Sequence, residues 1–119
     1  MFSSPCPCGS QDAYSDCCQP LHLGEAAAAT PEQLMRSRYC AYARGEFDYI
    51  FRTWHPRTRP KDVTTSPDLT WKRLEIVAAE GDTVEFKAHF RTSVGGDVMH
   101  EVSRFAQRAG RWVYVEPIA

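Results

Sequence analysis

Hydrophobic and polar residues alternate with a period of two through the C-terminal half of the chain, from Trp71 to Pro117. This run is interrupted at residues 80–82, 95–96 and 109–110, where glycine stands beside small or charged residues. Breaks of this kind between alternating runs are typical of antiparallel hairpins. The pattern therefore predicts four strands arranged as an antiparallel meander.

The alternation also predicts which side of this sheet is buried. Successive side chains of a strand point to opposite faces, so one face of the second strand is apolar and the other is charged. The residues expected on its buried side are Val84, Phe86, Ala88 and Phe90. The last strand is apolar on both sides, and we expect it to be buried on both faces.

Before the strands, the pattern becomes that of a helix with both ends marked. Thr30 is a favourable N-cap, Pro31 suits the first helical position, Gln33 completes a capping box and Gly45 is a stop signal. These signals predict a helix over residues 31–44.

A second helix is predicted directly afterwards, because apolar residues recur at helical spacing at positions 47, 50, 51 and 54. His55, which precedes Pro56, should end it. Two helices that lead into a curved four-stranded sheet predict an α+β half-cone. Helices that lean across the concave side of such a sheet leave a cavity at its open end.

The composition fits a globular chain. Its 119 residues, 43% hydrophobic and 24% charged, suffice for one compact domain and a small appendage. No apolar stretch approaches the roughly 20 residues of a membrane-spanning helix. The first residues have neither the basic nor the apolar region of a secretory signal, so we expect a reducing, cytoplasmic location.

Four of the five cysteines stand close together in the sequence CPCGSQDAYSDCC, which runs from Cys6 to Cys18. Disulfides explain this spacing poorly, because the Cα atoms of adjacent Cys17 and Cys18 are about 3.8 Å apart, which is too close for a normal bridge. Two close pairs joined by a turn can instead supply four ligands to zinc. We therefore predict a zinc site formed by Cys6, Cys8, Cys17 and Cys18.

Two alternatives to this ligand set remain open at this stage. His22 could replace one thiolate, or the cysteines could form a thiol cluster without a function. A closed site of four protein ligands leaves no position for water or substrate, so such a zinc ion stabilises a fold. Residues 1–24 contain few large apolar side chains, and binding energies of about 10 to 16 kcal/mol in small zinc modules would replace the missing core.

Charge is distributed unevenly along the chain, although the formal net charge is only −1. Residues 1–35 contain four carboxylates and no lysine or arginine, and four thiolates with one zinc ion would make this head more anionic. Residues 36–61 contain six arginines and one lysine. This basic segment could attract a polyanion, but docking of the acidic head onto the basic helices explains the distribution equally well.

Two stretches resemble known families. CPCGSQDAYSDCC resembles the SEC-C motif, a zinc-binding element, although Gln11 stands where the motif often has a second glycine. LMRSRYCAYARGEFDYIFRTWHPRTRP, residues 34–60, resembles the core signature of the YchJ family of bacterial proteins. The resemblance implies a nuclear-transport-factor-2-like, or cystatin-like, fold, and we expect residues 1–24 to form the zinc motif and residues 25–119 the α+β domain.

No catalytic residues are predicted. The sequence lacks a Ser-His-Asp arrangement, a phosphate loop, a dinucleotide fingerprint and an HExxH motif, and the resemblance implies none. Cys40 is expected to be a small buried packing residue. Polar or aromatic residues that could line the half-cone cavity are Arg36, Arg38, Tyr39, Trp54, His55 and Arg104, each of which also has a purely structural interpretation.

The sequence thus favours a zinc-binding protein that serves as an interaction module, with structural zinc and a protein partner that contacts the zinc motif. The alternative is that the cavity binds or converts a small molecule. Nucleic acid is disfavoured as a partner, because the basic segment should be divided between buried and exposed helix faces.

Overall fold

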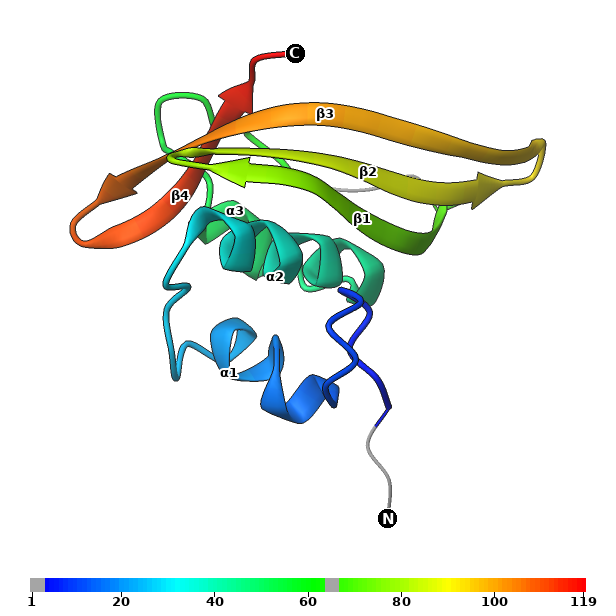
Figure 1. Ribbon diagram of the computed structural model, residues 1–119, viewed down its shortest axis with the longest axis horizontal. Coiled ribbons are helices and arrows are strands. Elements are labelled where there is room, and N and C mark those ends of the chain that lie inside the picture. The colour runs from blue at the N-terminus through cyan, green and yellow to red at the C-terminus, as the bar shows by residue number, and fades with distance from the viewer. Residues whose placement is uncertain (1–3, 64–66) are drawn as a thin grey trace.

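A computed structural model describes residues 4–63 and 67–119. A four-stranded sheet lies over two helices, and the N-terminal segment, residues 4–25, lies beneath those helices (Figure 1). The elements are η1 (Tyr14–Asp16), α1 (Gln19–His22), α2 (Pro31–Arg44), α3 (Phe47–Arg52), β1 (Thr70–Glu80), β2 (Thr83–Thr92), β3 (Gly95–Arg108) and β4 (Arg111–Pro117). The α+β architecture expected from the sequence is confirmed.

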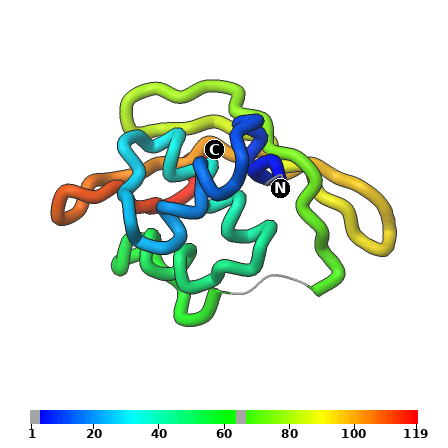
Figure 2. The backbone as a smooth tube through the Cα atoms, turned by 90° about the horizontal axis from the view of Figure 1, so that it is seen from below, coloured from blue at the N-terminus to red at the C-terminus, as the bar shows by residue number. Residues whose placement is uncertain are grey.

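The sheet is an antiparallel meander with the strand order β1-β2-β3-β4, as the alternating pattern predicts. Register shifts interrupt the β1–β2 pairing at two places and the β3–β4 pairing at one. Such bulges bend and twist a strand, and the sheet is curved around the helices. Seen from the helical side, the β2–β3 and β3–β4 hairpins extend beyond the helices in opposite directions (Figure 2).

Helix α2 begins and ends where its sequence signals place it. The Thr30 side chain accepts a hydrogen bond from the Gln33 backbone N–H at 3.1 Å, and the Gln33 side chain accepts one from the Ala29 N–H at 2.6 Å. These two bonds satisfy donors at the helix start. Gly45 closes the helix in the left-handed conformation, with φ 79°.

Helix α3 is shorter than predicted, and its buried face differs. It ends at Arg52, so Trp54 lies outside it and forms a bridge with Tyr114 of β4. Phe51 is 38% exposed, whereas Ile50 is completely buried. The ring of Phe51 lies under the guanidinium of Arg59 at 3.9 Å, so the loop after α3 covers a residue that the helical spacing assigned to the core.

The core lies between α2 and the concave face of the sheet. Val84, Phe86 and Ala88 are at most 2% exposed and contribute the predicted apolar side of β2. Leu21, from the N-terminal segment, also belongs to this core. In the described part of the chain, no helix combines the length and apolar character needed to cross a membrane.

Replacement of Gly45 by alanine tests the left-handed helix end. No heavy atom lies within 4 Å of an added Cβ, so the cost is that of the backbone conformation alone. We expect Gly45→Ala to lower the free energy of unfolding by about 1 kcal/mol, measured by urea denaturation. Gly96→Ala is the control, because Gly96 does not have a positive φ; an equal loss in both variants would contradict this explanation.

Candidate metal centre

The first two cysteines lie in a tight loop at the start of the described chain. Pro5 and Ala13 form an antiparallel bridge, and the Cys6 N–H donates to the Asp12 carbonyl at 2.8 Å. The loop turns at Gly9, whose φ is 85° and whose N–H donates to the Cys6 carbonyl at 3.1 Å. Gln11 also has a positive φ, 74°, which explains why a glycine is favourable at that position of the motif.

The second pair of cysteines follows the short helix η1 and begins α1. Cys18 is the N-cap residue of α1, and Pro20 lies in its first turn. The hydroxyl of Ser10 lies 3.1 Å from the Cys17 sulfur and can donate a hydrogen bond to it. The turn of the first pair is therefore attached to the second pair by a side-chain contact as well as by the backbone.

The four sulfur atoms converge as a site for one metal ion requires. Cys6, Cys8, Cys17 and Cys18 each have their Sγ atom within 4.8 Å of the other three. The Cys8–Cys17 and Cys17–Cys18 sulfur distances are 3.6 and 3.9 Å. Four sulfurs at about 2.3 Å from one ion in a tetrahedron lie about 3.8 Å from each other. The donor set and its spacing thus fit a tetrahedral thiolate metal site.

The protonation of these thiols is not uniform. Hydrogen bonding from Cys18, assisted by Ser10, lowers the pKa of Cys8 to about 4. Burial raises the pKa of Cys6 to about 12, and hydrogen bonds to Cys40 and Cys8 raise that of Cys18. A metal ion binds thiolates, so an ion that takes all four ligands displaces protons from the cluster.

Cys40, the fifth cysteine, lies against this cluster. It projects from α2, is completely buried, and its sulfur lies 3.7 Å from that of Cys6. The sequence predicts a small buried packing residue at this position, and the burial of Cys40 agrees with that prediction. Its contact with the cysteine cluster was missed, because a separation of 34 residues along the chain carries no signal of proximity.

His22 is engaged away from the sulfur cluster. Its Nε2 donates to the Ser37 carbonyl oxygen at 2.9 Å, and its Nδ1 accepts from the Tyr14 hydroxyl at 2.7 Å. Both ring nitrogens therefore have partners in the protein, and the alternative in which His22 replaces a thiolate is not favoured. Burial lowers the pKa of His22 below 6.5, so the imidazole is neutral and fastens α1 to α2.

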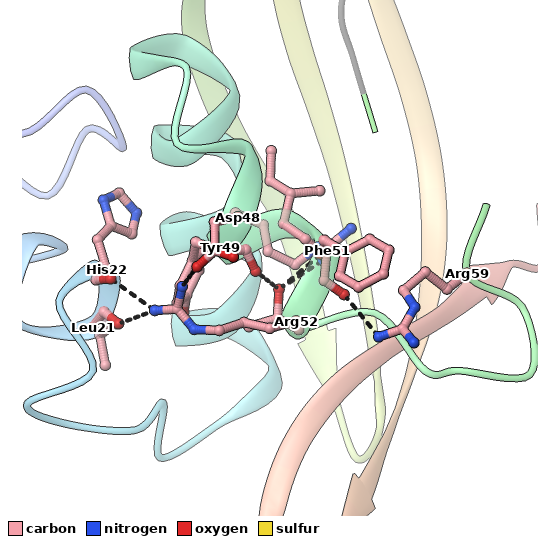
Figure 3. Close-up of polar contacts among 10 residues, drawn as sticks. Leu21, His22, Asp48, Tyr49, Phe51, Arg52 and Arg59 are labelled. Carbon is pink, nitrogen blue, oxygen red and sulfur yellow. Dashed lines mark hydrogen bonds and ion pairs between the residues drawn. The ribbon is translucent and has the colours of Figure 1, made fainter. Parts of the chain in front are cut away.

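Arginines of the basic segment hold the N-terminal segment against the helices. Arg52 of α3 donates to the carbonyl oxygens of Leu21 and His22 at 3.3 and 2.7 Å, and it pairs with Asp48 at 2.7 Å (Figure 3). Arg36 donates to the Cys8 carbonyl at 2.9 Å, and the Arg44 guanidinium lies 3.8 Å from the centre of the Tyr14 ring. These contacts support self-docking as the reason for the uneven charge.

The residues proposed for the half-cone cavity separate into two groups. Arg38, Tyr39 and Trp54 line a cavity of about 370 Å³ between α2 and the sheet. Arg36, His55 and Arg104 lie elsewhere: Arg36 contacts Glu32 and Cys8, the His55 Nδ1 accepts from the Arg57 N–H, and Arg104 pairs with Glu116. Glu101 also lines the cavity, as do Trp71 and Tyr114, which the sequence pattern did not assign to it.

Comparison with protein families gives two matches. Residues 30–117 match the family model described as "YchJ, middle NTF2-like domain", and residues 3–20 match the SEC-C motif. The chain is 51% identical to a UPF0225 protein of Deinococcus radiodurans, over 94% of this chain and 87% of that protein. It is 46% identical to a UPF0225 protein of Streptomyces coelicolor, over 98% and 96% of the two chains.

Two solved structures have the same fold over nearly the whole chain. A SEC-C motif containing protein from Rhodopseudomonas palustris, solved in solution, superimposes with a TM-score of 0.84 at 38% identity and covers 98% of both chains. A SEC-C motif containing protein from Psychrobacter arcticus, solved by crystallography, gives 0.77 at 30% identity, covering 100% of this chain and 83% of that one.

The environment of His22 predicts a measurable pH dependence. Its imidazole should titrate with a midpoint below 6.5, as followed by its ring proton shifts in NMR spectra. Between that midpoint and 6.5 the unfolded chain binds more protons than the folded chain, so the free energy of unfolding should decrease as the pH falls below about 6.5. A midpoint above 6.5 would contradict the contacts described for this ring.

Proposed function

This chain belongs to the YchJ family (UPF0225), and we propose that its SEC-C motif binds one structural zinc ion and presents the N-terminal segment to a protein partner. The ligands in this proposal are Cys6, Cys8, Cys17 and Cys18. The observation that carries it is the convergence of these four sulfurs to within 4.8 Å of one another. Zinc supplies cross-linking rather than reactivity here, because four protein ligands leave no open position.

The N-terminal segment has a clear need for such a cross-link. Its buried interior in residues 4–18 is formed mainly by cysteines together with Tyr14. Few apolar side chains from the N-terminal segment reach the core of the sheet domain. Leu21 is one of the buried residues of that core. Hydrophobic burial contributes only about 1.5 to 3 kcal/mol for each large side chain, so metal binding would supply most of the stability of this segment.

The exposed side of the segment has the character of a contact surface. Leu23 is 63% exposed directly after α1. Asp12, Asp16 and Glu25 are exposed on the same segment. The nearby Arg36 and Arg52 donate hydrogen bonds to backbone carbonyls of the segment. A partner with a small apolar pocket surrounded by lysine or arginine would complement this surface.

The zinc proposal predicts one zinc ion per chain. Elemental analysis of purified, reduced protein should give this ratio, and Cys8→Ser should weaken zinc binding by more than about 100-fold. Cys40→Ser is the matched control, because it removes an equally buried thiol that lies outside the ligand set. Absence of zinc from the wild-type protein would contradict the proposal. Equal zinc loss in both variants would contradict the assignment of the ligands.

The partner proposal predicts that capture depends on both zinc and Leu23. Immobilised wild-type protein should retain a basic protein from a bacterial lysate, and retention should decrease with salt because charges contribute to it. Cys8→Ser should abolish retention, and Leu23→Asp should weaken it about tenfold while zinc remains bound. Retention that is unchanged by Leu23→Asp would show that this surface is not the contact.

A further inference from the structure

The cavity between α2 and the concave face of the sheet is separate from the sulfur cluster and has its own chemistry. Its volume of about 370 Å³ is within the range of small-molecule sites. Most of its wall is apolar or aromatic, and its charged side chains are Arg38 and Glu101. The aromatic residues that line it are Tyr39, Tyr42, Trp54, Trp71, Phe86 and Tyr114.

Arg38 is a buried cation without a carboxylate partner among the described residues. It is only 3% exposed, and guanidinium groups remain charged in proteins. Its Nη1 donates to the Ile50 carbonyl at 2.9 Å and to the Thr53 hydroxyl at 2.8 Å. Within residues 4–63 and 67–119, its Nε and Nη2 atoms make no hydrogen bond. Burial of a charge costs free energy unless the charge is paired, so this arrangement favours an anion beside Arg38.

Glu101, the carboxylate of the cavity wall, is held by other residues. Its Oε2 accepts hydrogen bonds from the Ser103 hydroxyl and, at 3.1 Å, from the Tyr114 hydroxyl. It makes no ion pair with Arg38 in the part of the chain that the structure describes. The Glu101 carboxylate therefore contributes negative charge near Arg38 but does not bond to the Nε and Nη2 donors of its guanidinium.

The free side of Arg38 has the shape that a carboxylate requires. The guanidinium lies against the rings of Trp54 and Tyr114, which meet edge to face, with its carbon 5.0 and 4.7 Å from their centres. Since Nη1 is occupied, Nε and Nη2 remain as two parallel N–H donors on one edge. This edge matches the two oxygens of a carboxylate in a bidentate pair.

The remainder of the wall favours a flat ring as the body of the ligand. The Trp71 ring lies 5.8 Å from that of Tyr39 and 5.7 Å from that of Phe90 between centres, so the part of the wall that β1 contributes is also aromatic. The indole nitrogens of Trp54 and Trp71 are buried and have no acceptor among the described residues. Unpaired buried donors are uncommon in proteins, and they mark this wall as one whose polar groups are not fully satisfied.

From these observations we propose that the cavity binds a small aromatic molecule with one carboxylate group. Arg38 pairs with the carboxylate through Nε and Nη2, and the ring lies among the aromatic side chains of α2, β1 and β4. This binding site is distinct from the proposed zinc site, since the N-terminal segment that carries the cysteine pairs lies on the side of α2 away from the sheet (Figure 1).

Benzoate titrated into the full-length, zinc-loaded, ¹⁵N-labelled protein tests the proposal. The chain has three tryptophans: Trp71 lines this cavity alone, Trp54 lines both this cavity and a neighbouring cleft, and Trp112 lines that cleft alone. Benzoate should shift the indole N–H signals of Trp71 and Trp54 in a saturable manner and leave that of Trp112 in place. Benzamide, which lacks the charge, and acetate, which lacks the ring, should each bind at least about tenfold more weakly.

Two variants and a control locate the interaction. Arg38→Met should weaken benzoate binding by at least about tenfold. Arg104→Met is the control, because it removes an arginine outside the cavity and should leave the affinity for benzoate unchanged. Because Arg38→Met also removes the bonds to Ile50 and Thr53 and could impair folding, Ala88→Leu provides a second test that keeps Arg38 and fills the cavity. It should abolish the Trp71 shift.

Three results would overturn the proposal. The first is the absence of any Trp71 shift in the wild-type protein. The second is a shift of Trp112 without Trp71, which would place the anion in the cleft lined by Arg52, Arg59, Arg108 and Arg111. The third is binding of acetate as tight as that of benzoate, which would indicate simple ion pairing without recognition of a ring.

Discussion

Helix α2 is covered on two sides, and the arrangement of the whole chain depends on this constraint. The sheet buries one side of the helix, where Leu34 and Tyr39 join the main core, and the N-terminal segment buries another side, where Cys40 joins the sulfur cluster. A helix between two layers must place polar atoms where they find partners. Ser37 does so through the Leu34 carbonyl and the Tyr49 hydroxyl.

The layer beneath α2 is held by polar and coordinating groups more than by apolar area. His22 bonds to the helix backbone, arginines bond to backbone carbonyls of the segment, and the four sulfurs lie at distances suited to one metal ion. Polar contacts of this kind are individually modest in water, about 0.5 to 1.5 kcal/mol each. Together they orient the segment, whereas metal binding would supply the larger part of its stability.

The layer above α2 depends on different physics. A curved sheet and a straight helix do not fit closely along their whole length, and the space that remains is lined by aromatic rings and by Arg38. The same helix thus contributes Cys40 to the sulfur cluster and Arg38 to the cavity, two residues apart in sequence but on different faces.

Much of this structure follows from the sequence by local rules. The caps at Thr30 and Gly45, the strand breaks at 80–82 and 109–110 and the alternation along β2 predicted the elements and their order, because each signal acts on residues close along the chain. The break predicted at residues 95–96 falls two residues earlier, because both glycines pair with β2 as the first residues of β3. The spacing of the four N-terminal cysteines likewise indicated a metal site, because the ligands of each pair are neighbours in sequence.

Contacts between distant segments were decided only by the tertiary structure. Arg36 and Arg38 are equivalent as sequence signals, yet one bonds to the Cys8 carbonyl and the other packs against the rings of Trp54 and Tyr114. Phe51 lies outside the core and packs against Arg59 of the loop that follows α3. Local pattern determines which face of a helix a residue occupies, but which element packs against that face depends on the path of the whole chain.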